Sequence, residues 1–270
     1  MTMAQDGRRT ALITGASAGI GEAFAHEYAR RGWNLVLTAR REDRLRALAQ
    51  ELADVRGVAA RVLPADLADP AAPAALVDEL GRAGVPVDAL VNNAGFGVAG
   101  SYRSTTWAQQ RDGIQVMVTA VAELTHRLLP GMIDRRYGRI VNVASVAGLV
   151  PSPPGHTLYG ASKSFLVKFS QALAAEVRAY GVHVTALCPG FTFSEFHDVA
   201  GTRGQVRQLP SFMWMDAATV ARQGVDAVEA GEVIYVNGPV NWTLTTLAKY
   251  LPDWLTEAVV LRNSGKFRKV

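Results

Sequence analysis

Short apolar runs rich in β-branched residues alternate with longer helical patterns along nearly the whole of this chain. The runs are continuously hydrophobic, as strands are when helices cover both faces of a parallel sheet. Between them, apolar residues recur at helical spacing, for example Phe165, Phe169, Leu173 and Val177. This alternation predicts one doubly wound α/β domain with about seven parallel strands and helices on both faces. The predicted strands are Ala11–Thr14, Asn34–Thr38, Ala60–Leu63, Ala89–Val91, Arg139–Val143, His183–Leu187 and Val233–Val236.

Composition excludes several classes of protein. The 270 residues are 49% hydrophobic and 19% charged, which favours a packed core over disorder. The net charge is +4, but the basic residues are scattered, so we expect no nucleic-acid binding. A single cysteine, Cys188, excludes an intramolecular disulfide and is expected to be a buried structural thiol. Without metal-ligand spacing, a signal peptide or an apolar stretch of about 18 residues, the chain is expected to be soluble, cytoplasmic and metal-free.

Two segments interrupt the alternation. Residues 191–214 lie between the sixth strand and the next helix, where ligands bind in this architecture, so we expect a substrate lid there. Residues 241–270 follow the core domain (1–240) as a C-terminal helical extension with basic residues nearby. We expect this helix to pack on its own domain or a sister subunit, although a basic, Trp-bearing helix also suits a membrane surface. Its apolar face would contain Trp242, Leu244, Leu247, Leu251, Leu255 and Val259.

A glycine turn follows the first strand directly. The sequence from Thr14 to Gly21 reads T-G-A-S-A-G-I-G and opens a helical pattern at Glu22. Glycine permits a sharp turn and a close approach of the backbone to a phosphate. The helix that follows offers free N–H groups and the positive end of its dipole. A glycine triplet in this position predicts a dinucleotide-binding site.

The spacing G-x-x-x-G-x-G resembles that of the short-chain dehydrogenase/reductase family. Further markers of this resemblance follow successive strands, from about Thr10 to Gly238. The resemblance implies a Rossmann-like fold, a nicotinamide cofactor, interconversion of a carbonyl and an alcohol, and a homodimer or homotetramer. The markers are Asp66-Leu67, Asn92-Asn93-Ala94-Gly95, Ser145, Tyr159-Gly160-Ala161-Ser162-Lys163 and Pro189-Gly190.

The residues after the second strand indicate which cofactor binds. A carboxylate at this point would bind the 2′-hydroxyl of NAD and repel a 2′-phosphate. Here the strand ends in Ala39-Arg40-Arg41, with no acid before Glu42. Guanidinium groups match phosphate oxygens, so we expect NADP(H) to be preferred over NAD(H), with Arg40 as the main contact and Ser17 and Arg41 as helpers.

Other cofactor contacts follow from the resemblance. It implies that Asp66 and Leu67 border the adenine, that Asn92 contacts the adenosine side, and that Thr192 meets the nicotinamide carboxamide. The remaining cofactor-binding residues expected from the motifs are Gly15, Gly19, Ile20, Gly21, Ala94, Gly95, Tyr159, Lys163, Pro189 and Gly190.

Tyr159 and Lys163 are four residues apart in a helical pattern, which places them on one face, one turn apart. A tyrosine has a reference pKa of about 10, and a neighbouring ammonium together with an oxidised nicotinamide would lower it. We expect Tyr159 to act as the general acid or base and Ser145 to hold the substrate oxygen. The resemblance implies that Lys163 also holds the nicotinamide ribose.

Two features depart from the family pattern. Met117 stands where the family usually has a catalytic asparagine, and a thioether cannot donate a hydrogen bond. The water-linked proton relay that the asparagine is thought to support is therefore in doubt, and we expect activity to survive, at a reduced level. The path from Ser145 to Tyr159 is also one residue longer than usual, within the loop Pro151–Gly155, where an insertion costs little.

The expected substrate pocket is apolar, which predicts a hydrophobic ketone or aldehyde. Ordinary core packing of its aromatic residues is an equal alternative, and His156 is a minor candidate for substrate contact. Two other functions stay open: a cofactor-binding protein of weak or no catalysis, suggested by Met117, and a 3-oxoacyl thioester reductase. The expected pocket residues are Phe96, the loop Leu149–Thr157, Phe191, Phe193 and Trp214.

Overall fold

The computed structural model describes residues 7–98, 100–195 and 210–264. Seven strands form one parallel sheet in the order β3-β2-β1-β4-β5-β6-β9, which confirms the predicted doubly wound fold. Strands β1, β2, β4 and β5 are buried along their whole length, as their uninterrupted apolar runs predict. The strands are β1 (Thr10–Thr14), β2 (Asn34–Thr38), β3 (Ala60–Val62), β4 (Ala89–Asn92), β5 (Gly138–Val143), β6 (Val182–Cys188) and β9 (Ile234–Val236).

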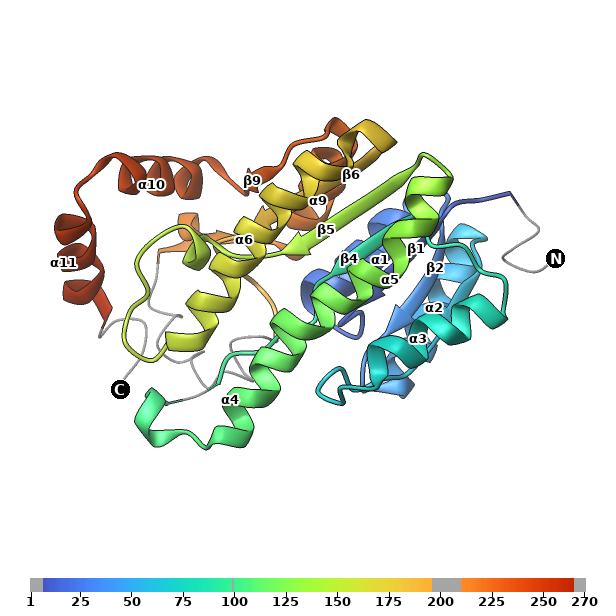
Figure 1. Cartoon of the computed structure of the whole chain (residues 1–270), viewed down its shortest axis with the longest axis horizontal. Helices are drawn as coiled ribbons and strands as arrows, with labels where there is room; N and C mark the ends of the chain where they lie inside the picture. Colours follow the sequence, from blue (N-terminus) through green and yellow to red (C-terminus); the bar gives the residue numbers. More distant parts are fainter. Residues whose placement is uncertain (1–6, 99, 196–209, 265–270) are drawn as a thin grey trace.

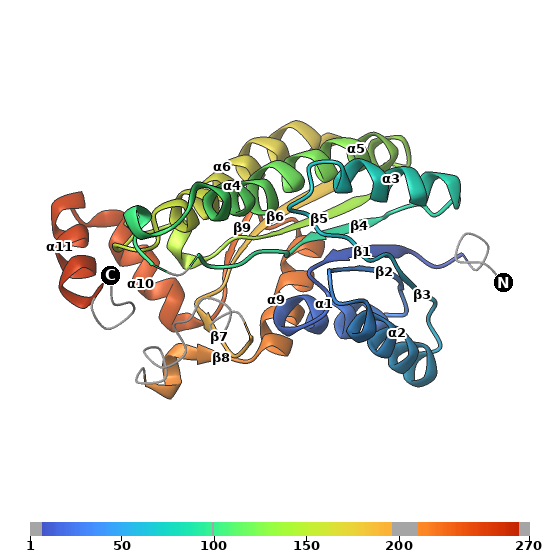
Figure 2. The ribbon, with the colours of Figure 1, turned by 90° about the horizontal axis from the view of Figure 1, so that it is seen from below.

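Helices cover both faces of the sheet (Figures 1 and 2). On one face lie α1 (Gly19–Arg30), α2 (Glu42–Arg56) and α9 (Ala217–Ala230). On the other lie α3 (Ala72–Arg82), α5 (Ala120–Asp134) and α6 (Thr157–Val177). The described ranges also contain the helices α4 (Trp107–Ile114), α10 (Pro239–Tyr250) and α11 (Asp253–Ser264).

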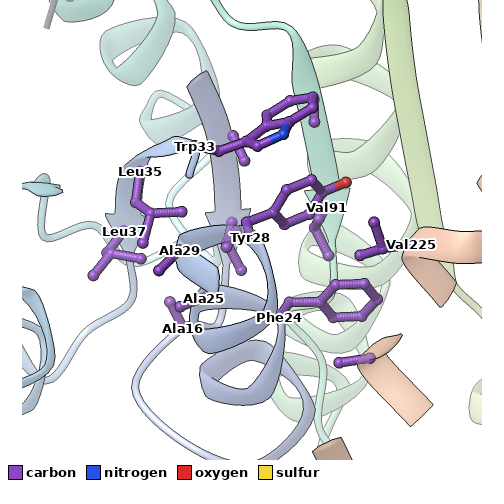
Figure 3. Close-up of a cluster of buried hydrophobic side chains, with 14 of the residues drawn as sticks. Ala16, Phe24, Ala25, Tyr28, Ala29, Trp33, Leu35, Leu37, Val91 and Val225 are labelled. Atoms are coloured by element: carbon purple, nitrogen blue, oxygen red, sulfur yellow. The ribbon is translucent and has the colours of Figure 1, made fainter. Parts of the chain in front are cut away.

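The core beneath α1 shows why this face is stable. Phe24 and Tyr28 on α1 are fully buried, and the Tyr28 ring lies 5.0 Å from that of Trp33. Figure 3 shows these rings between the sheet residues and Val225 of α9. Burying one large apolar side chain contributes about 1.5–3 kcal/mol, so this cluster fixes α1, and with it the glycine turn, against the sheet.

The strand order reverses between β1 and β4, and the ligand crevice of such sheets lies at this point. Thr14, the last residue of β1, joins the two strands: its hydroxyl donates to Val91 O at 3.1 Å. The same oxygen accepts from the backbone N–H groups of Asn93 and Ala94 at 2.9 and 3.0 Å. The two loops that frame the crevice are therefore held in register.

Two regions differ from the sequence-based expectation. Within 191–214, residues 191–192 (β7) and 214–215 (β8) pair as a small parallel sheet, and residues 196–209 of the predicted lid lie outside the described ranges. The C-terminal extension contains two helices where one was expected, because Pro252 disfavours helix in the residue before it, and Leu251 is extended (φ −84°, ψ 149°).

The C-terminal helices lie at the end of the molecule opposite the N-terminus (Figures 1 and 2). Much of their expected apolar face is exposed: Trp242, Leu247 and Leu251 are 58%, 56% and 41% accessible. These residues therefore do not pack on their own domain, and packing on a sister subunit stays a prediction. In the described part of the chain, no helix is long and apolar enough to cross a membrane. Those same ranges contain no cluster of three or more potential metal ligands.

Candidate active site

The glycine turn between β1 and α1 is shaped as a phosphate cradle. Gly15 and Gly19 have φ of +67° and +60°, a region that side chains other than glycine rarely adopt. A Cβ on Gly21 would lie 2.2 Å from Gly15 O, so the turn closes only around glycine. The N-cap residue of α1, Ala18, makes no side-chain capping bond, which leaves the first N–H groups of the helix available to an anion. These features fit a dinucleotide pyrophosphate.

A cavity of about 640 Å³ opens at the carboxyl ends of the strands and extends from this turn to Tyr159. It brings together most of the residues predicted from the sequence. Asn92 and Gly21 are not among its lining residues: the Asn92 amide donates to Asn142 Oδ1 at 2.8 Å and so joins β4 to β5, whereas Asn93 lines the cavity. The predicted residues that line it are Gly15, Ser17, Gly19, Ile20, Arg40, Arg41, Asp66, Leu67, Ala94, Gly95, Ser145, Tyr159, Lys163, Pro189, Gly190 and Thr192.

The basic end of the cavity is built from the start of α2. Arg40 lines the cavity, as predicted, but Arg41 is the residue that contacts Ser17, with Nε and Nη2 at 3.2 and 3.1 Å from its hydroxyl oxygen. Arg44, one helical turn beyond Arg41, points to the same place, and both arginines pair with Glu195. Sequence reasoning missed Arg44, although its spacing from Arg41 places the two on one helix face.

The catalytic end combines the end of β5 with the first turns of α6. Ser145 follows β5 and caps a short 3₁₀ turn, its Oγ accepting from Ala147 N at 3.1 Å. Tyr159, in the first turn of α6, hydrogen-bonds with Ser145. Lys163, one turn later, is buried, and its Nζ donates to Val143 O at 2.7 Å and lies 5.6 Å from the Tyr159 ring centroid. The three predicted catalytic side chains therefore converge.

Burial dominates the electrostatics of this group in the protein without a cofactor. Burial raises the pKa of Tyr159 to about 12, and the hydrogen bond with Ser145 lowers it only in part. Burial also lowers the pKa of Lys163 to about 8, because the ammonium loses water. That lowering was expected from Lys163 together with an oxidised nicotinamide, so it stays a prediction: in the protein by itself, burial dominates both groups, and the Lys163 ammonium is directed to Val143 O.

Met117 lies in a π-helical turn, residues 115–119, between α4 and α5. Its side chain is buried and packs against Gly95 and Ser162, with Sδ 3.8 Å from the Ser162 hydroxyl. π-Turns inside helices are rare and often mark functional sites. Here the turn directs Val116 toward the cavity and leaves a thioether beside the catalytic helix.

The wall near Tyr159 is largely apolar and comes from several loops. Phe96, Phe191 and His156 line it as predicted, together with Val150, Pro151 and Pro153 of the longer loop. Phe193 and Trp214 are not among the lining residues: they stack on each other outside the cavity with ring centroids 4.7 Å apart, and Phe193 is 60% exposed. Sequence reasoning missed Asp112 of α4 and Val260 of α11, which also line the cavity.

Comparison with known proteins agrees with this geometry. Residues 9–202 match the family model described as short chain dehydrogenase. The chain belongs to the short-chain dehydrogenase family. It is an oxidoreductase by membership, and its resemblance to that family is confirmed.

Three relatives illustrate the range within the family. A sulfoacetaldehyde reductase from Chromohalobacter salexigens is 44% identical over 190 residues, which cover 68% of this chain and 73% of the relative. A short-chain dehydrogenase from Sphingobium yanoikuyae in complex with NADPH is 35% identical, with a TM-score of 0.79 over 89% of this chain and 93% of that one. The bulky-bulky ketone specific alcohol dehydrogenase from Comamonas testosteroni is 30% identical, with a TM-score of 0.75 over 89% and 92%.

Proposed function

We propose that this protein interconverts hydrophobic ketones or aldehydes and their alcohols with NADP(H), Tyr159 being the general acid or base. The observation that carries the proposal is one continuous cavity with a phosphate cradle and two arginines at one end and the bonded pair Ser145–Tyr159 at the other. A dinucleotide with its adenosine at the arginines would direct its nicotinamide toward Tyr159. Bound there, the nicotinamide supplies or accepts the hydride.

Each catalytic residue has a role at a stated atom. In reduction, the carbonyl oxygen accepts hydrogen bonds from the Ser145 and Tyr159 hydroxyls and takes the proton of Tyr159 as it becomes an alkoxide. Because burial raises the pKa of Tyr159 to about 12, the phenol is protonated at neutral pH and ready to donate. The Lys163 ammonium stabilises the phenolate left behind until solvent returns a proton.

Preference for NADP(H) over NAD(H) is part of this proposal. Supporting it, the end of β2 carries no carboxylate, Arg40, Arg41 and Ser17 line the cavity, and Arg44 lies one helical turn along α2 from Arg41. The NADPH complex of the Sphingobium yanoikuyae relative is consistent with this choice.

The lining near Tyr159 favours a hydrophobic substrate over a small anionic one such as sulfoacetaldehyde. Phe96, Val150, Phe191 and Val260 offer apolar contacts. Asp112 lines the same cavity, and a carboxylate there opposes binding of a sulfonate. We also propose that the protein is cytoplasmic, forms a homodimer or homotetramer, and divides at about residue 240 into a core domain and its extension.

The test measures how fast the purified protein reduces each of four kinds of substrate with NADPH, monitored as the loss of NADPH absorbance. The substrates are aromatic ketones, bulky aliphatic ketones, sulfoacetaldehyde and a 3-oxoacyl thioester. We expect the hydrophobic ketones to have the highest kcat/KM. Y159F should lower kcat by about 10²–10⁴-fold, the usual contribution of a general acid. The matched control Y180F removes an exposed hydroxyl from the 3₁₀ turn that follows α6 and should leave kcat unchanged.

Other outcomes would redirect the proposal. Tight NADPH binding without turnover on any carbonyl would favour the cofactor-binding protein suggested by Met117. Preference for the thioester would favour the 3-oxoacyl reductase. Equal rates for Y159F and the unmodified protein would refute the role given to Tyr159.

A further inference from the structure

Arg41, at the adenosine end of the cavity, and Arg44, one helical turn along α2, already hold an anion from this chain. Glu195 follows the short strand β7 (Phe191–Thr192), and its carboxylate pairs with both arginines. Its Oε2 lies 2.7 Å from Arg41 Nη1, and its Oε1 lies 2.6 Å from Arg44 Nη1. Both carboxylate oxygens are used, and each has a guanidinium of its own.

This ion-pair cluster adjoins the glycine turn. Arg41 is also bonded to the hydroxyl of Ser17, a residue of that turn, at 3.1 Å. On the other side, the Cβ of Ser194 lies 2.8 Å from where a Cβ on Gly19 would be. Residues 194 and 195 therefore cover the turn and bridge the arginines at once, and both line the cavity proposed for the cofactor.

A carboxylate and a phosphate compete for the same partners. Both present oxygens to guanidinium forks, and a 2′-phosphate bound between Arg41, Arg44 and Ser17 would need the donors that Glu195 uses. A like-charged carboxylate left in place would also repel the phosphate. Arg41 and Arg44 hold the pKa of Glu195 below its usual value, so the side chain keeps its negative charge at neutral pH.

We infer that Glu195 is an internal competitor for the 2′-phosphate site, which sets how strongly the protein distinguishes phosphorylated from unphosphorylated dinucleotides. The inference rests on the proposed use of NADP(H) at this cavity. NADP(H) has to displace Glu195 from both arginines, whereas NAD(H) has no phosphate to place there and leaves the pairs intact. Glu195 therefore weakens binding of NADP(H) selectively.

Adenosine 2′,5′-bisphosphate and 5′-AMP test this directly, because they differ only in the 2′-phosphate. Their Kd values would be measured by calorimetry at low ionic strength, where charge pairs at the surface are least screened. E195Q keeps the shape of the side chain and removes its charge. We expect E195Q to bind the bisphosphate about three- to tenfold more tightly, as for the loss of two partly exposed ion pairs, and 5′-AMP within about twofold.

Two further variants make the result specific. E42Q removes the same charge from the first turn of α2, but Glu42 pairs with Arg46, so the bisphosphate affinity should stay within about twofold. R44M should weaken the bisphosphate and leave 5′-AMP unchanged, and combining it with E195Q should remove most of the gain of E195Q.

The outcomes separate this inference from the function on which it depends. If the unmodified protein binds the bisphosphate no better than 5′-AMP, the NADP(H) preference itself fails. The unmodified protein could prefer the bisphosphate while E195Q leaves that preference unchanged or lowers it. Glu195 would then serve to order the arginines, and its role as a competitor of the 2′-phosphate would be refuted. A loss of 5′-AMP binding in E195Q would show that the carboxylate holds a ribose hydroxyl instead, which also overturns the inference.

Discussion

Replacing Lys163 by methionine is expected to make the protein more stable while it removes activity. Lys163 is 5% exposed, and burial lowers its pKa from 10.5 to about 8. The unfolded chain therefore binds a proton between pH 8 and 10.5 where the folded protein does not. Folding stability contributed by this group accordingly rises with pH across that window, and below pH 8 the full penalty for a buried charge applies.

The magnitude follows from the two pKa values. The difference corresponds to about 3 kcal/mol at pH 7 and to about half of that at pH 9.5. Methionine has similar length and no charge, so it removes this penalty. It also removes the bond from Nζ to Val143 O, which is worth about 1 kcal/mol. We expect K163M to gain about 2 kcal/mol at pH 7 and much less at pH 9.5.

Urea unfolding at both pH values, without cofactor, measures these differences. The control K168M alters an exposed lysine of the same helix, so its free energy of unfolding should change by less than about 0.5 kcal/mol at either pH. Turnover of K163M should fall by about 10²-fold or more, because the phenolate loses its counter-charge. A K163M protein that is less stable at pH 7, or whose advantage does not shrink as the pH rises, would refute the reasoning.

Three other predictions concern single contacts. G21A should abolish NADPH binding, measured by calorimetry, because its Cβ would lie 2.2 Å from Gly15 O; ordinary affinity would contradict the cradle. M117L should keep kcat within about threefold, and it should lower the free energy of unfolding, measured in urea, by less than about 1.5 kcal/mol, because the Met117 side chain fills space. A tenfold lower kcat would instead show that the thioether takes part in the reaction. D216A should lower the free energy of unfolding by about 1 kcal/mol, because Asp216 caps α9 by accepting a hydrogen bond from Thr219 N at 2.7 Å. An unchanged free energy of unfolding would show that this cap does not stabilise the protein.

The sequence predicted the sheet and the convergence of the motifs because both depend on local pattern. Continuous apolar runs indicate buried parallel strands, and the loops that follow such strands meet at one edge. The spacing of Tyr159 and Lys163 likewise predicts a shared helix face, which α6 provides. The placements of Asn92, Phe193 and Trp214 were not predictable in this way, because which neighbour a side chain meets depends on tertiary packing.

The pKa values of the protein without a cofactor could not be predicted for a related reason. Spacing shows that an ammonium is near a phenol, but it does not show how much water either group keeps. Burial raises the pKa of Tyr159 and lowers that of Lys163, so the loss of water is the main influence on each group. The partnership of Arg44 with Glu195 spans 151 positions in the sequence, so no local pattern could reveal it. The break at Pro252 was visible in the sequence and should have divided the extension into two helices.

The bond from Lys163 to Val143 O has a consequence for how the enzyme adapts to different substrates. It joins the second turn of the catalytic helix to the strand residue two positions before Ser145, so the serine, the tyrosine and the lysine share one rigid support. A bulkier substrate cannot be accommodated by shifting one of these groups alone. Evolution or engineering of new substrate ranges should therefore act on the surrounding walls, the loop before α6 and helix α11, whose residues can change without disturbing the reacting centre.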